Sequence, residues 1–393
     1  MGVRSLDDLL TDGVRGQRVF VRADLNVPLQ DRAITDDSRL RASLPTIRRL
    51  QEAGARVIVA SHLGRPKGHP VAALSLRPVA ARLAELLGAG VAFCEECVGE
   101  PARCAIDDLG DGRVLLLENL RFHAGEERND PDFSNALATL ADIYVNDAFG
   151  TAHRAHASTA GMAAHFDRAA AGDLMDSELR HLRVIREPIR PLLVILGGAK
   201  VSDKLSVLEA LAPHADVIAI GGAMAYTFLA ANEDATGNSL VEPDRFGDAL
   251  AVQRAARENE RRLLLPSDHL VADRFEADAP TRVVAEIPEG ALGLDIGPET
   301  ARRYASEAAN AKTIFWNGPM GVFEMKAFAE GTRTVATAVA DSPATSVVGG
   351  GDSLAAIHQL GLDNRIDHLS TGGGASLEYV QGLTLPGVAA LER

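Results

Sequence analysis

The chain has 393 residues, and 40 lysines and arginines against 54 aspartates and glutamates give it a formal net charge of −14. This acidic balance argues against a nucleic-acid binder or a membrane-surface binder, because either needs a basic face. Apolar residues make up 46% of the chain and aromatic residues only 4%, so the core must be aliphatic, and the length suits two or three globular domains.

Short apolar runs recur along the chain, each followed by turn residues and then by a helical pattern. These runs lie at 18–22, 56–60, 114–117, 192–196, 217–220, 313–316 and 345–348. Runs that are apolar at successive positions predict strands buried on both faces. Helical spacing appears between them, as at 78–87, 203–211 and 246–261. The sequence therefore predicts an α/β fold with βαβ units throughout, in two Rossmann-like domains of three layers each, with a parallel sheet between helices.

A single helix is expected between the two sheet systems. Residues 173–187 carry an apolar stripe at helical spacing, and Pro188 and Pro191 end it before the strand pattern restarts. Such a helix would hold two domains in a definite relation and act as a hinge. We predict a first domain at 1–172, the linking helix and hinge at 173–190, and a second domain at 191–377.

The three cysteines do not form a disulfide framework. Cys94 and Cys97 have the C-x-x-C spacing of metal and redox sites, with Cys104 nearby, but no second pair completes a four-ligand zinc site. We interpret them as incidental thiols. The N-terminus has no apolar signal segment, and the longest uncharged apolar stretch, 217–231, is shorter than the ~20 residues of a membrane span. We expect a cytoplasmic protein without a membrane partner.

The strands of the first half end in basic and polar side chains. They are Asp24 and Asn26, His62 and Arg65, Arg121, and His153 and Arg154, with Arg39 one turn signal after the first strand. Because ligands of parallel sheets bind at the carboxyl ends of the strands, these side chains should share one face. Arginine offers a planar fork for phosphate and carboxylate, so the pattern predicts a site for a small phosphorylated anion.

The strands of the second half end in glycines instead. They are Gly197-Gly198, Gly221-Gly222, Gly349-Gly350-Gly351 and Gly372-Gly373-Gly374. Glycine lets backbone N–H groups approach phosphate closely, so four such turns predict a nucleotide polyphosphate site. Lys200 and Lys204 are expected on one face of a helix that opens toward the phosphates. Asp352 is placed to reach a Mg²⁺ ion that bridges them.

Two domains with different ligands favour phosphoryl transfer between two substrates, which depends mainly on positioning and charge neutralisation. No P-loop fingerprint and no dinucleotide fingerprint is found in the sequence. Two alternatives remain open at this point. One is a nucleotide-dependent oxidoreductase, which NAD(P)H binding would reveal, and the other is a two-lobed anion-binding protein, which would bind no nucleotide.

Longer motifs between Arg22 and Glu378, which is nearly the whole chain, resemble those of the phosphoglycerate kinase family. They are Arg22-Ala-Asp-Leu-Asn-Val-Pro28, Ser61-His-Leu-Gly-Arg-Pro66, Leu117-Glu-Asn-Leu-Arg-Phe122, Tyr144-Val-Asn-Asp-Ala-Phe-Gly-Thr-Ala-His-Arg-Ala-His156, Leu196-Gly-Gly-Ala-Lys-Val-Ser-Asp-Lys204, Gly293-Leu-Asp-Ile-Gly-Pro298, Phe315-Trp-Asn-Gly-Pro-Met-Gly-Val-Phe-Glu324, Gly349-Gly-Gly-Asp-Ser353 and Ser370-Thr-Gly-Gly-Gly-Ala-Ser-Leu-Glu378. The resemblance implies reversible transfer of the acyl phosphate of 1,3-bisphosphoglycerate to Mg-ADP, which gives ATP and 3-phosphoglycerate. It also implies a monomer, and a C-terminal tail from about 378 to 393 that returns to the first domain.

The resemblance also implies roles for individual residues. The glycerate substrate would be held by Asp24, Leu25, Asn26, Arg39, His62, Leu63, Gly64, Arg65, Arg121 and Arg154. The nucleotide would be held by Gly198, Lys200, Lys204, Gly222, Gly293, Asn317, Pro319, Glu324, Gly350, Gly351, Asp352 and Ser353, with Asp352 reaching Mg²⁺ through the nucleotide. The transferring phosphoryl group would be stabilised by Arg39, Lys200, Gly372 and Gly373.

Departures from the family's pattern are mild: Ala23 and Leu25 stand at packing positions of the first motif, and Asp173 is a candidate N-cap of the linking helix. Other residues also have a purely structural interpretation. His153 and His156 are candidate structural histidines, and Trp316 is a candidate core residue. If each domain holds one ligand, closure of the two domains would bring the ligands in line and expel water.

Overall fold

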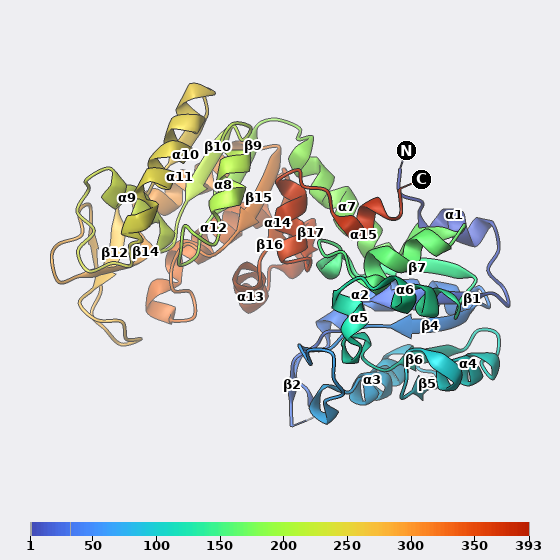
Figure 1. The fold of residues 1–393 in the computed structure, drawn as a ribbon. Helices are drawn as coiled ribbons and strands as arrows, with labels where there is room; N and C mark the ends of the chain where they lie inside the picture. Colours follow the sequence, from blue (N-terminus) through green and yellow to red (C-terminus); the bar gives the residue numbers. More distant parts are fainter. Residues whose placement is uncertain (1, 32, 393) are drawn as a thin grey trace. The chain divides into compact units, whose positions relative to one another are not determined.

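The computed structural model describes residues 2–31 and 33–392, which form two compact units. The first unit comprises the described residues up to Arg180 and from Thr384 onward, and the second comprises His181–Leu383. The division falls inside α7 (Asp173–Arg186), the helix that the sequence predicts between the domains (Figure 1). Each unit is an α/β structure built on a parallel sheet, as the sequence predicts.

The first unit is built on a six-stranded sheet in the order β5-β6-β4-β1-β7-β8, with every strand pair parallel. Its strands are β1 (Arg18–Ala23), β4 (Arg56–Ala60), β5 (Val91–Cys94), β6 (Val114–Leu117), β7 (Ile143–Asp147) and β8 (Ala169–Ala171), and β2 (Leu29–Gln30) and β3 (Ala33–Ile34) form a separate hairpin. Its helices are α1 (Leu6–Thr11), α2 (Ser38–Glu52), α3 (Arg77–Leu87), α4 (Gly99–Asp107), α5 (Ala124–Glu127), α6 (Pro131–Ala138) and α15 (Pro386–Ala389).

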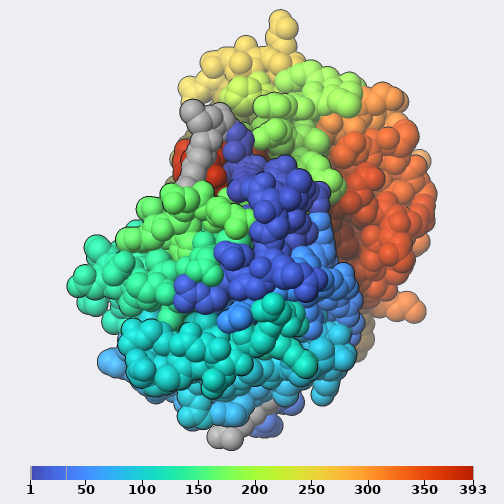
Figure 2. Space-filling model, turned by 90° about the vertical axis from the view of Figure 1, so that its right-hand side faces the viewer, coloured from blue at the N-terminus to red at the C-terminus, as the bar shows by residue number. Residues whose placement is uncertain are grey.

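Both faces of this sheet are buried. Val19 and Val21 of β1 pack in one aliphatic core with helices α1, α2 and α3, while Phe20, on the opposite face, lies against Tyr144 with ring centroids 6.3 Å apart. The uninterrupted apolar runs of the sequence follow from this two-sided burial. The C-terminal segment belongs to the same unit, because Gly387 N donates to Ala152 O at 2.8 Å. In Figure 2 the dark blue N-terminal segment lies against green residues of this unit, where Ala171 N donates to Arg4 O at 2.8 Å.

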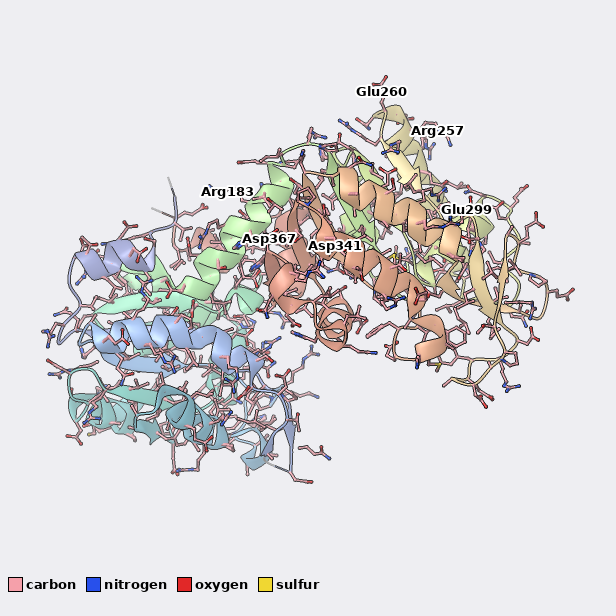
Figure 3. The ribbon with its side chains drawn as sticks, turned by 180° about the vertical axis from the view of Figure 1, so that it is seen from behind. Arg183, Arg257, Glu260, Glu299, Asp341 and Asp367 are labelled. Atoms are coloured by element: carbon pink, nitrogen blue, oxygen red, sulfur yellow. The ribbon has the colours of Figure 1, made fainter. Side chains whose placement is uncertain are left out.

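The second unit is built on a six-stranded parallel sheet in the order β11-β10-β9-β15-β16-β17. Its strands are β9 (Leu192–Leu196), β10 (Val217–Ile220), β11 (Arg262–Leu264), β15 (Thr313–Asn317), β16 (Thr345–Gly349) and β17 (His368–Ser370). Its helices are α8 (Leu205–Leu211), α9 (Met224–Ala231), α10 (Phe246–Glu258), α11 (Pro298–Asn310), α12 (Glu330–Asp341), α13 (Gly351–Leu360) and α14 (Gly374–Val380). Asp367, labelled in Figure 3, accepts from Ser346 N at 2.8 Å and ties β17 to β16.

One part of the second unit departs from the prediction of βαβ units throughout. Strands β12 (His269–Ala272), β13 (Arg282–Val284) and β14 (Leu292–Ile296) form an antiparallel sheet in the order β13-β12-β14. Strand β13 is exposed at Arg282 and Val283, which point to opposite faces, and the buried strand β14 contains Gly293 and Asp295. These strands therefore lack the long apolar runs of the parallel sheets. The prediction failed here because it relied on such runs.

The caps of the linking helix also differ from the prediction. Asp173 is the first residue of α7, and its carboxylate pairs with Arg49. The free N–H groups of the first turn are satisfied by Asp147, whose Oδ1 accepts from Leu174 N at 2.9 Å and from Met175 N at 3.3 Å. The candidate N-cap Asp173 is therefore wrong, and the cap comes from the end of β7. Full burial raises the pKa of Asp147 to about 7.

Candidate functional site

The first unit holds a small pocket at the carboxyl ends of β1, β4, β6 and β7. It has a volume of about 200 Å³ and is lined by Asp24, Asn26, Arg39, His62, Gly64, Arg65, Arg121, Gly150, Thr151, His153 and Arg154. Parallel strands place the residues that follow them at one edge of the sheet, so side chains distant in sequence meet here. The four arginines make the pocket cationic in an otherwise acidic chain. We call it the anion pocket.

Short hydrogen bonds fix the walls of the anion pocket before any ligand arrives. Arg39 Nη1 donates to Asp24 Oδ2 at 2.7 Å, so the guanidinium is held at the end of β1. Asn26 Oδ1 accepts from Gly64 N at 2.9 Å, and Arg121 Nη1 donates to Gly64 O at 2.9 Å. The loop after β4 is thus tied to the ends of both β1 and β6. Such preorganisation lowers the entropic cost of binding a ligand.

The orientation of His62 is set by Arg22, a side chain with no exposed surface. Arg22 Nη2 lies 3.1 Å from His62 Nδ1. A guanidinium can only donate, so Nδ1 accepts and the ring proton of the neutral imidazole stands on Nε2. Burial, and then the charges of Arg22 and Arg121, hold the pKa of His62 well below its usual range. His62 therefore offers an N–H donor to the pocket without carrying a charge.

A buried chain of hydrogen bonds holds Arg22 in turn. Arg22 Nε donates to Ser158 Oγ at 2.8 Å, and Ser158 Oγ donates to Glu126 Oε1 at 2.5 Å. Burial raises the pKa of Glu126, although the charge of Arg22 opposes this shift. His156 lies against the same carboxylate, with Nδ1 3.9 Å from Oε1, and burial followed by the charges of Arg121 and Arg22 lowers its pKa to about 4.

The side chains of two residues expected at the substrate are buried. Leu25 and Leu63 are buried, and their backbone N–H groups donate to Ser61 Oγ at 2.9 Å and to Asn119 Oδ1 at 3.2 Å. Neither lines the anion pocket. The pocket wall also includes Gly150 and Thr151, which the residue-by-residue prediction missed although they lie inside the 144–156 motif. His153, one of the two candidate structural histidines, lines the wall as well.

The second unit holds a larger cavity of about 520 Å³. It is lined by Gly198, Ala199, Gly222, Ala223, Asn238, Ser239, Leu240, Phe275, Leu292, Gly293, Leu294, Pro319, Gly321, Val322, Glu324 and Asp352. Gly198, Gly222 and Asp352 lie in the turns that follow strands of the parallel sheet. Phe275, Leu292 and Leu294 come from the antiparallel sheet and its loops, and Leu240 comes from the loop after α9. We call it the glycine pocket. Its apolar wall escaped the sequence prediction because no strand-end glycine marks it.

Close backbone approach explains why glycine occupies this wall. Gly222 has φ of +66°, and a Cβ added there would lie 2.6 Å from both N and O of Gly198. A Cβ on Gly318 would lie 2.1 Å from Gly197 O. The loops after β9, β10 and β15 therefore touch through their main chains, and any side chain at these positions would force them apart.

The predicted helix that carries both lysines is wrong. Helix α8 begins at Leu205, so Lys200 and Lys204 lie in the segment between β9 and this helix. Lys200 is exposed. Lys204 is half-buried, and its Nζ donates to Asn317 Oδ1. Burial lowers the pKa of Lys204, while Asp203 and Asp352 oppose this shift.

The remaining predicted nucleotide residues surround the start of α13. Gly350 precedes the helix with φ of +91°, Gly351 begins it, and Asp352 is exposed in its first turn. Ser353 is buried and its Oγ accepts from Gly318 N at 2.6 Å, so it ties α13 to the loop after β15. Neither Ser353 nor Asn317 lines the glycine pocket.

The turn after β17 carries the two glycines that the prediction assigns to the transferring group. Gly372 is buried, and Gly373 is exposed with φ of +55° directly before α14. Neither lines the glycine pocket. Trp316 is a core residue, as the structural interpretation holds, and its Nε1 donates to Gly318 O at 2.7 Å.

Asp352 fits a metal that arrives with the nucleotide. Within the described residues, no group of three or more histidine, cysteine, aspartate or glutamate side chains could hold a metal ion. Mg²⁺ commonly uses one or two carboxylates together with substrate phosphates, and Asp352 supplies one exposed carboxylate at the cavity wall. In the part of the chain that the structure describes, no helix is long and apolar enough to cross a membrane.

Two Rossmann-like units, one with a cationic pocket and one with a glycine-lined cavity, provide separate sites for two different ligands, as a kinase with two substrates requires. Comparison with known proteins specifies the family. The phosphoglycerate kinase family model matches residues 6–383. The chain belongs to the phosphoglycerate kinase family and is a phosphotransferase enzyme.

Individual relatives agree along their full length. The chain is 53% identical over 398 residues to the phosphoglycerate kinase of Anaeromyxobacter dehalogenans, which covers 100% of both chains. It is 55% identical over 403 residues to that of Streptomyces griseus, which covers 99% of this chain and 100% of the relative. Its fold matches the phosphoglycerate kinase of Coxiella burnetii with a TM-score of 0.91 at 41% identity, over 99% of this chain and 98% of the other.

Proposed function

We propose that the enzyme transfers the acyl phosphate of 1,3-bisphosphoglycerate to ADP, reversibly, with the glycerate substrate in the anion pocket and the nucleotide in the glycine pocket. The observation that carries the assignment is the contrast between the two linings. One is small and holds four arginines, and the other is larger, half apolar and rich in glycine. A compact multiply charged acid suits the first, and a flat base with a phosphate chain suits the second.

In the anion pocket, the arginines divide the charge of the substrate between them. Arg65, Arg121 and Arg154 would bind the 3-phosphate, since a guanidinium can donate two parallel hydrogen bonds to phosphate oxygens. Asp24 and Asn26, with His62 as a neutral donor, would hold the glycerate hydroxyl and carboxyl groups. Arg39 is tethered to Asp24 and keeps donors for the carboxyl end of the substrate, where the phosphoryl group is transferred.

In the glycine pocket, apolar and polar walls would bind different parts of the nucleotide. The base would lie against Leu240, Phe275 and Val322, and Glu324 would accept from the ribose. The glycine turns let the phosphates approach the main chain. Lys204 would neutralise phosphate charge, and Asp352 would bind the Mg²⁺ that the nucleotide carries. When bound, Mg²⁺ neutralises charge on the phosphate oxygens.

Phosphoryl transfer requires that the charge on the transferring phosphoryl group be stabilised. Arg39 from the first unit and Lys200 from the second would supply it, together with main-chain N–H groups of Gly372 and Gly373. Lys200 is exposed and forms no direct part of the glycine-pocket wall, which suits a side chain that engages only during transfer. We further propose that closure about the 173–190 segment brings the ligands in line and excludes water, and that the enzyme acts as a cytosolic monomer.

Isothermal titration calorimetry on two single variants tests this assignment of ligands. Arg65→Ala removes an exposed guanidinium, and we expect 3-phosphoglycerate to bind about 10–100-fold more weakly while ADP binding is unchanged, since a charge-assisted hydrogen bond contributes about 1.5–3 kcal/mol. Phe275→Ala, in an exposed loop, should weaken ADP alone. Loss of ADP affinity in Arg65→Ala, or of 3-phosphoglycerate affinity in Phe275→Ala, would overturn the assignment.

A further inference from the structure

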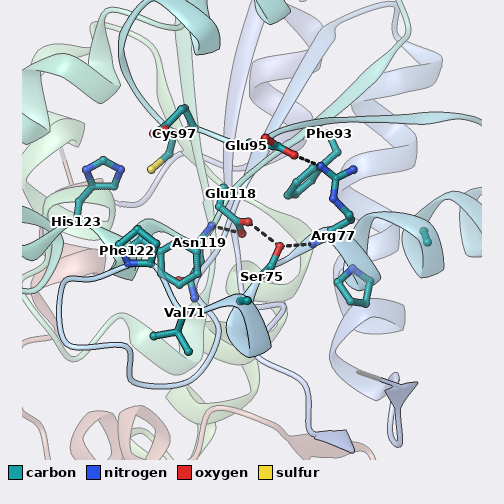
Figure 4. A pocket seen from close by; sticks show the side chains of 15 residues that line it. Val71, Ser75, Arg77, Phe93, Glu95, Cys97, Glu118, Asn119, Phe122 and His123 are labelled. Atoms are coloured by element: carbon teal, nitrogen blue, oxygen red, sulfur yellow. Dashed lines mark hydrogen bonds and ion pairs between the residues drawn. The ribbon is translucent and has the colours of Figure 1, made fainter. Parts of the chain in front are cut away.

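A second cavity of the first unit lies beside the anion pocket and has no part in the function proposed above. It has a volume of about 990 Å³, near the upper end of the ~300–1,000 Å³ usual for ligand pockets. Its lining comes from the loop after β4, helix α3, the Cys94–Cys97 turn after β5 and the segment after β6 (Figure 4). We call it the side cavity.

The side cavity shares two walls with the anion pocket. In the loop after β4, Gly64 and Arg65 line the anion pocket, whereas residues from Pro70 to Ser75 line the side cavity. After β6, Arg121 lines the anion pocket, whereas Asn119 and Phe122, its near neighbours in the chain, line the side cavity. A ligand in the side cavity would therefore press on the same segments that hold the anionic substrate.

Asn119 links these two walls through hydrogen bonds on both sides. Its Nδ2 donates to Leu74 O at 3.0 Å and to Leu63 O at 2.7 Å, and its Oδ1 accepts from Arg121 N at 3.1 Å. Asn119 has no exposed surface, so breaking these bonds would leave buried polar groups unpaired. The segments around the two pockets are thus coupled by a buried side chain that has few other hydrogen-bond partners.

Glu118 adds a second link on the side-cavity wall. Its Oε2 accepts from Ser75 Oγ at 2.6 Å, and its Oε1 accepts from Asn119 N at 2.8 Å (Figure 4). The same Oε1 also accepts from Leu76 N at 2.8 Å. These bonds tie the 70–75 loop to the end of β6. The carboxylate oxygens keep free lone pairs, so Glu118 can accept a further hydrogen bond from a ligand.

The charge of the side cavity is opposite to that of the anion pocket. Glu95, Glu96 and Glu118 line it against a single guanidinium, that of Arg77, which pairs with Glu95. Among the residues that the structure describes, neither Glu96 nor Glu118 forms an ion pair. Burial lowers the pKa of His123, so the imidazole in the wall does not offset these carboxylates near neutral pH. The cavity would therefore repel phosphorylated substrates and nucleotides.

The rest of the lining is apolar or aromatic. Phe93 and Phe122 face the cavity together with Val71, which is 37% exposed, and Cys97 lies buried at one edge. Aromatic faces favour flat apolar groups and attract cations. The ligand that suits both features is an organic cation with an apolar body.

We propose that the side cavity is a regulatory site for such an apolar organic cation, and that its occupation strengthens binding of the anionic substrate. Two observations indicate that the bound cation would raise, and not lower, the affinity for the anionic substrate. The cation adds positive charge next to a pocket that binds an anion, and it holds the shared segments in the positions that Glu118 and Asn119 already impose. The effect on the anion pocket rests on the substrate assignment proposed above, whereas cation binding itself does not.

Three indole probes of similar size test the chemistry of the site: tryptamine, which is cationic, tryptophol, which is neutral, and indole-3-propionate, which is anionic. Calorimetry on the full chain should show tryptamine binding about tenfold tighter than tryptophol. The three carboxylates and one guanidinium of the cavity leave two net negative charges, and each can contribute up to about fivefold. Indole-3-propionate should bind most weakly. Equal affinities for the three probes, or no binding of tryptamine, would refute the site.

Variants locate the binding. The double variant Glu95→Gln with Glu96→Gln changes two exposed side chains and should reduce the preference for tryptamine to about twofold or less. Ala81→Phe, on the exposed face of α3, should fill the cavity and remove binding of all three probes. The matched control Glu258→Gln, at the exposed end of α10 in the other unit, should bind as the parent does. A loss in the control equal to that in the double variant would mean binding to the acidic surface in general.

The coupling is tested by reciprocity. Saturating tryptamine should lower the Kd for 3-phosphoglycerate about two- to fivefold, and saturating 3-phosphoglycerate must lower the Kd for tryptamine by the same factor. The Kd for ADP should not change. Tryptamine binding without any shift in either Kd would refute the regulatory role. If 3-phosphoglycerate does not bind at all, the substrate assignment fails, and the probe series alone then decides whether the cavity takes cations.

Discussion

Replacement of Gly222 by alanine tests how tightly the strand-end loops shape the glycine pocket. Gly222 has φ of +66°, and its new Cβ would meet Gly198 N and O at 2.6 Å. The left-handed backbone costs an alanine about 1–2 kcal/mol. Overpacking against main-chain atoms, which cannot rotate away as a side chain can, adds about 1–3 kcal/mol. We therefore expect the second unit to lose about 2–5 kcal/mol of unfolding free energy in Gly222→Ala.

Two other glycines of the same unit separate these costs. Gly361 has φ of +67° with nothing within 4 Å of its Cβ position, so Gly361→Ala should lose only the backbone part, about 1–2 kcal/mol. Gly247 lies inside α10 with open space and without positive φ, so Gly247→Ala should be neutral or gain up to about 1 kcal/mol. From most to least stable, the expected order of the variants is Gly247→Ala, Gly361→Ala, Gly222→Ala.

Urea unfolding followed by Trp316 fluorescence measures this order. Trp316 is the only tryptophan of the chain and is buried in the second unit, so its emission reports that unit. Calorimetry with ADP supplies the functional counterpart: Gly222→Ala should weaken ADP at least about tenfold, because displaced Gly198 and Pro319 line the cavity. Equal stability of Gly222→Ala and Gly361→Ala would refute the close approach of the loops.

Three further predictions concern other parts of the molecule. Lys200→Ala should lower kcat about 100-fold or more while both KM values stay within about threefold in steady-state kinetics, and an unchanged kcat would remove Lys200 from the transfer step. Ser158→Ala should lower the free energy of unfolding in urea by about 1–3 kcal/mol and raise the KM for 3-phosphoglycerate, because Arg22 loses a hydrogen-bond partner. An unchanged KM would show that Ser158 does not position His62 through Arg22. Because the pKa of Asp147 is raised to about 7 in the folded state, the stability that it contributes is complete below about pH 4 and lost as pH rises to about 7. Asp147→Asn should therefore stabilise the protein by about 3 kcal/mol more at pH 8 than at pH 5, relative to the parent, and a difference that does not vary with pH would contradict the raised pKa.

The sequence predicted the parallel sheets well because their strands carry a strong local signal. A run such as 192–196 is apolar at every position since both of its faces are covered, and the structure gives β9 the same bounds. The antiparallel sheet lacks this signal, and with it the sequence missed the apolar wall that Leu240 and Phe275 build. These residues meet the glycine turns only through tertiary packing.

Residues of the candidate site were predictable where they lie within a few residues of a strand end. Asp24, His62 and Arg121 lie at strand ends, and the topology of a parallel sheet brings them to one pocket. Residues behind them were not predictable individually. Arg22 acts through hydrogen bonds that cross from β1 to Ser158, and Asp147 caps a helix that begins 26 residues later in the chain. Partners separated by such distances leave no periodic pattern in the sequence.

The most direct test of the central claim is a steady-state assay with Mg-ATP and 3-phosphoglycerate, coupled to NADH oxidation through glyceraldehyde-3-phosphate dehydrogenase. We expect turnover that requires both substrates and Mg²⁺, and that falls in Arg65→Ala and Lys200→Ala through KM and kcat respectively. Absence of turnover, with ADP still bound in a separate titration, would contradict the assignment of the anion pocket to 3-phosphoglycerate.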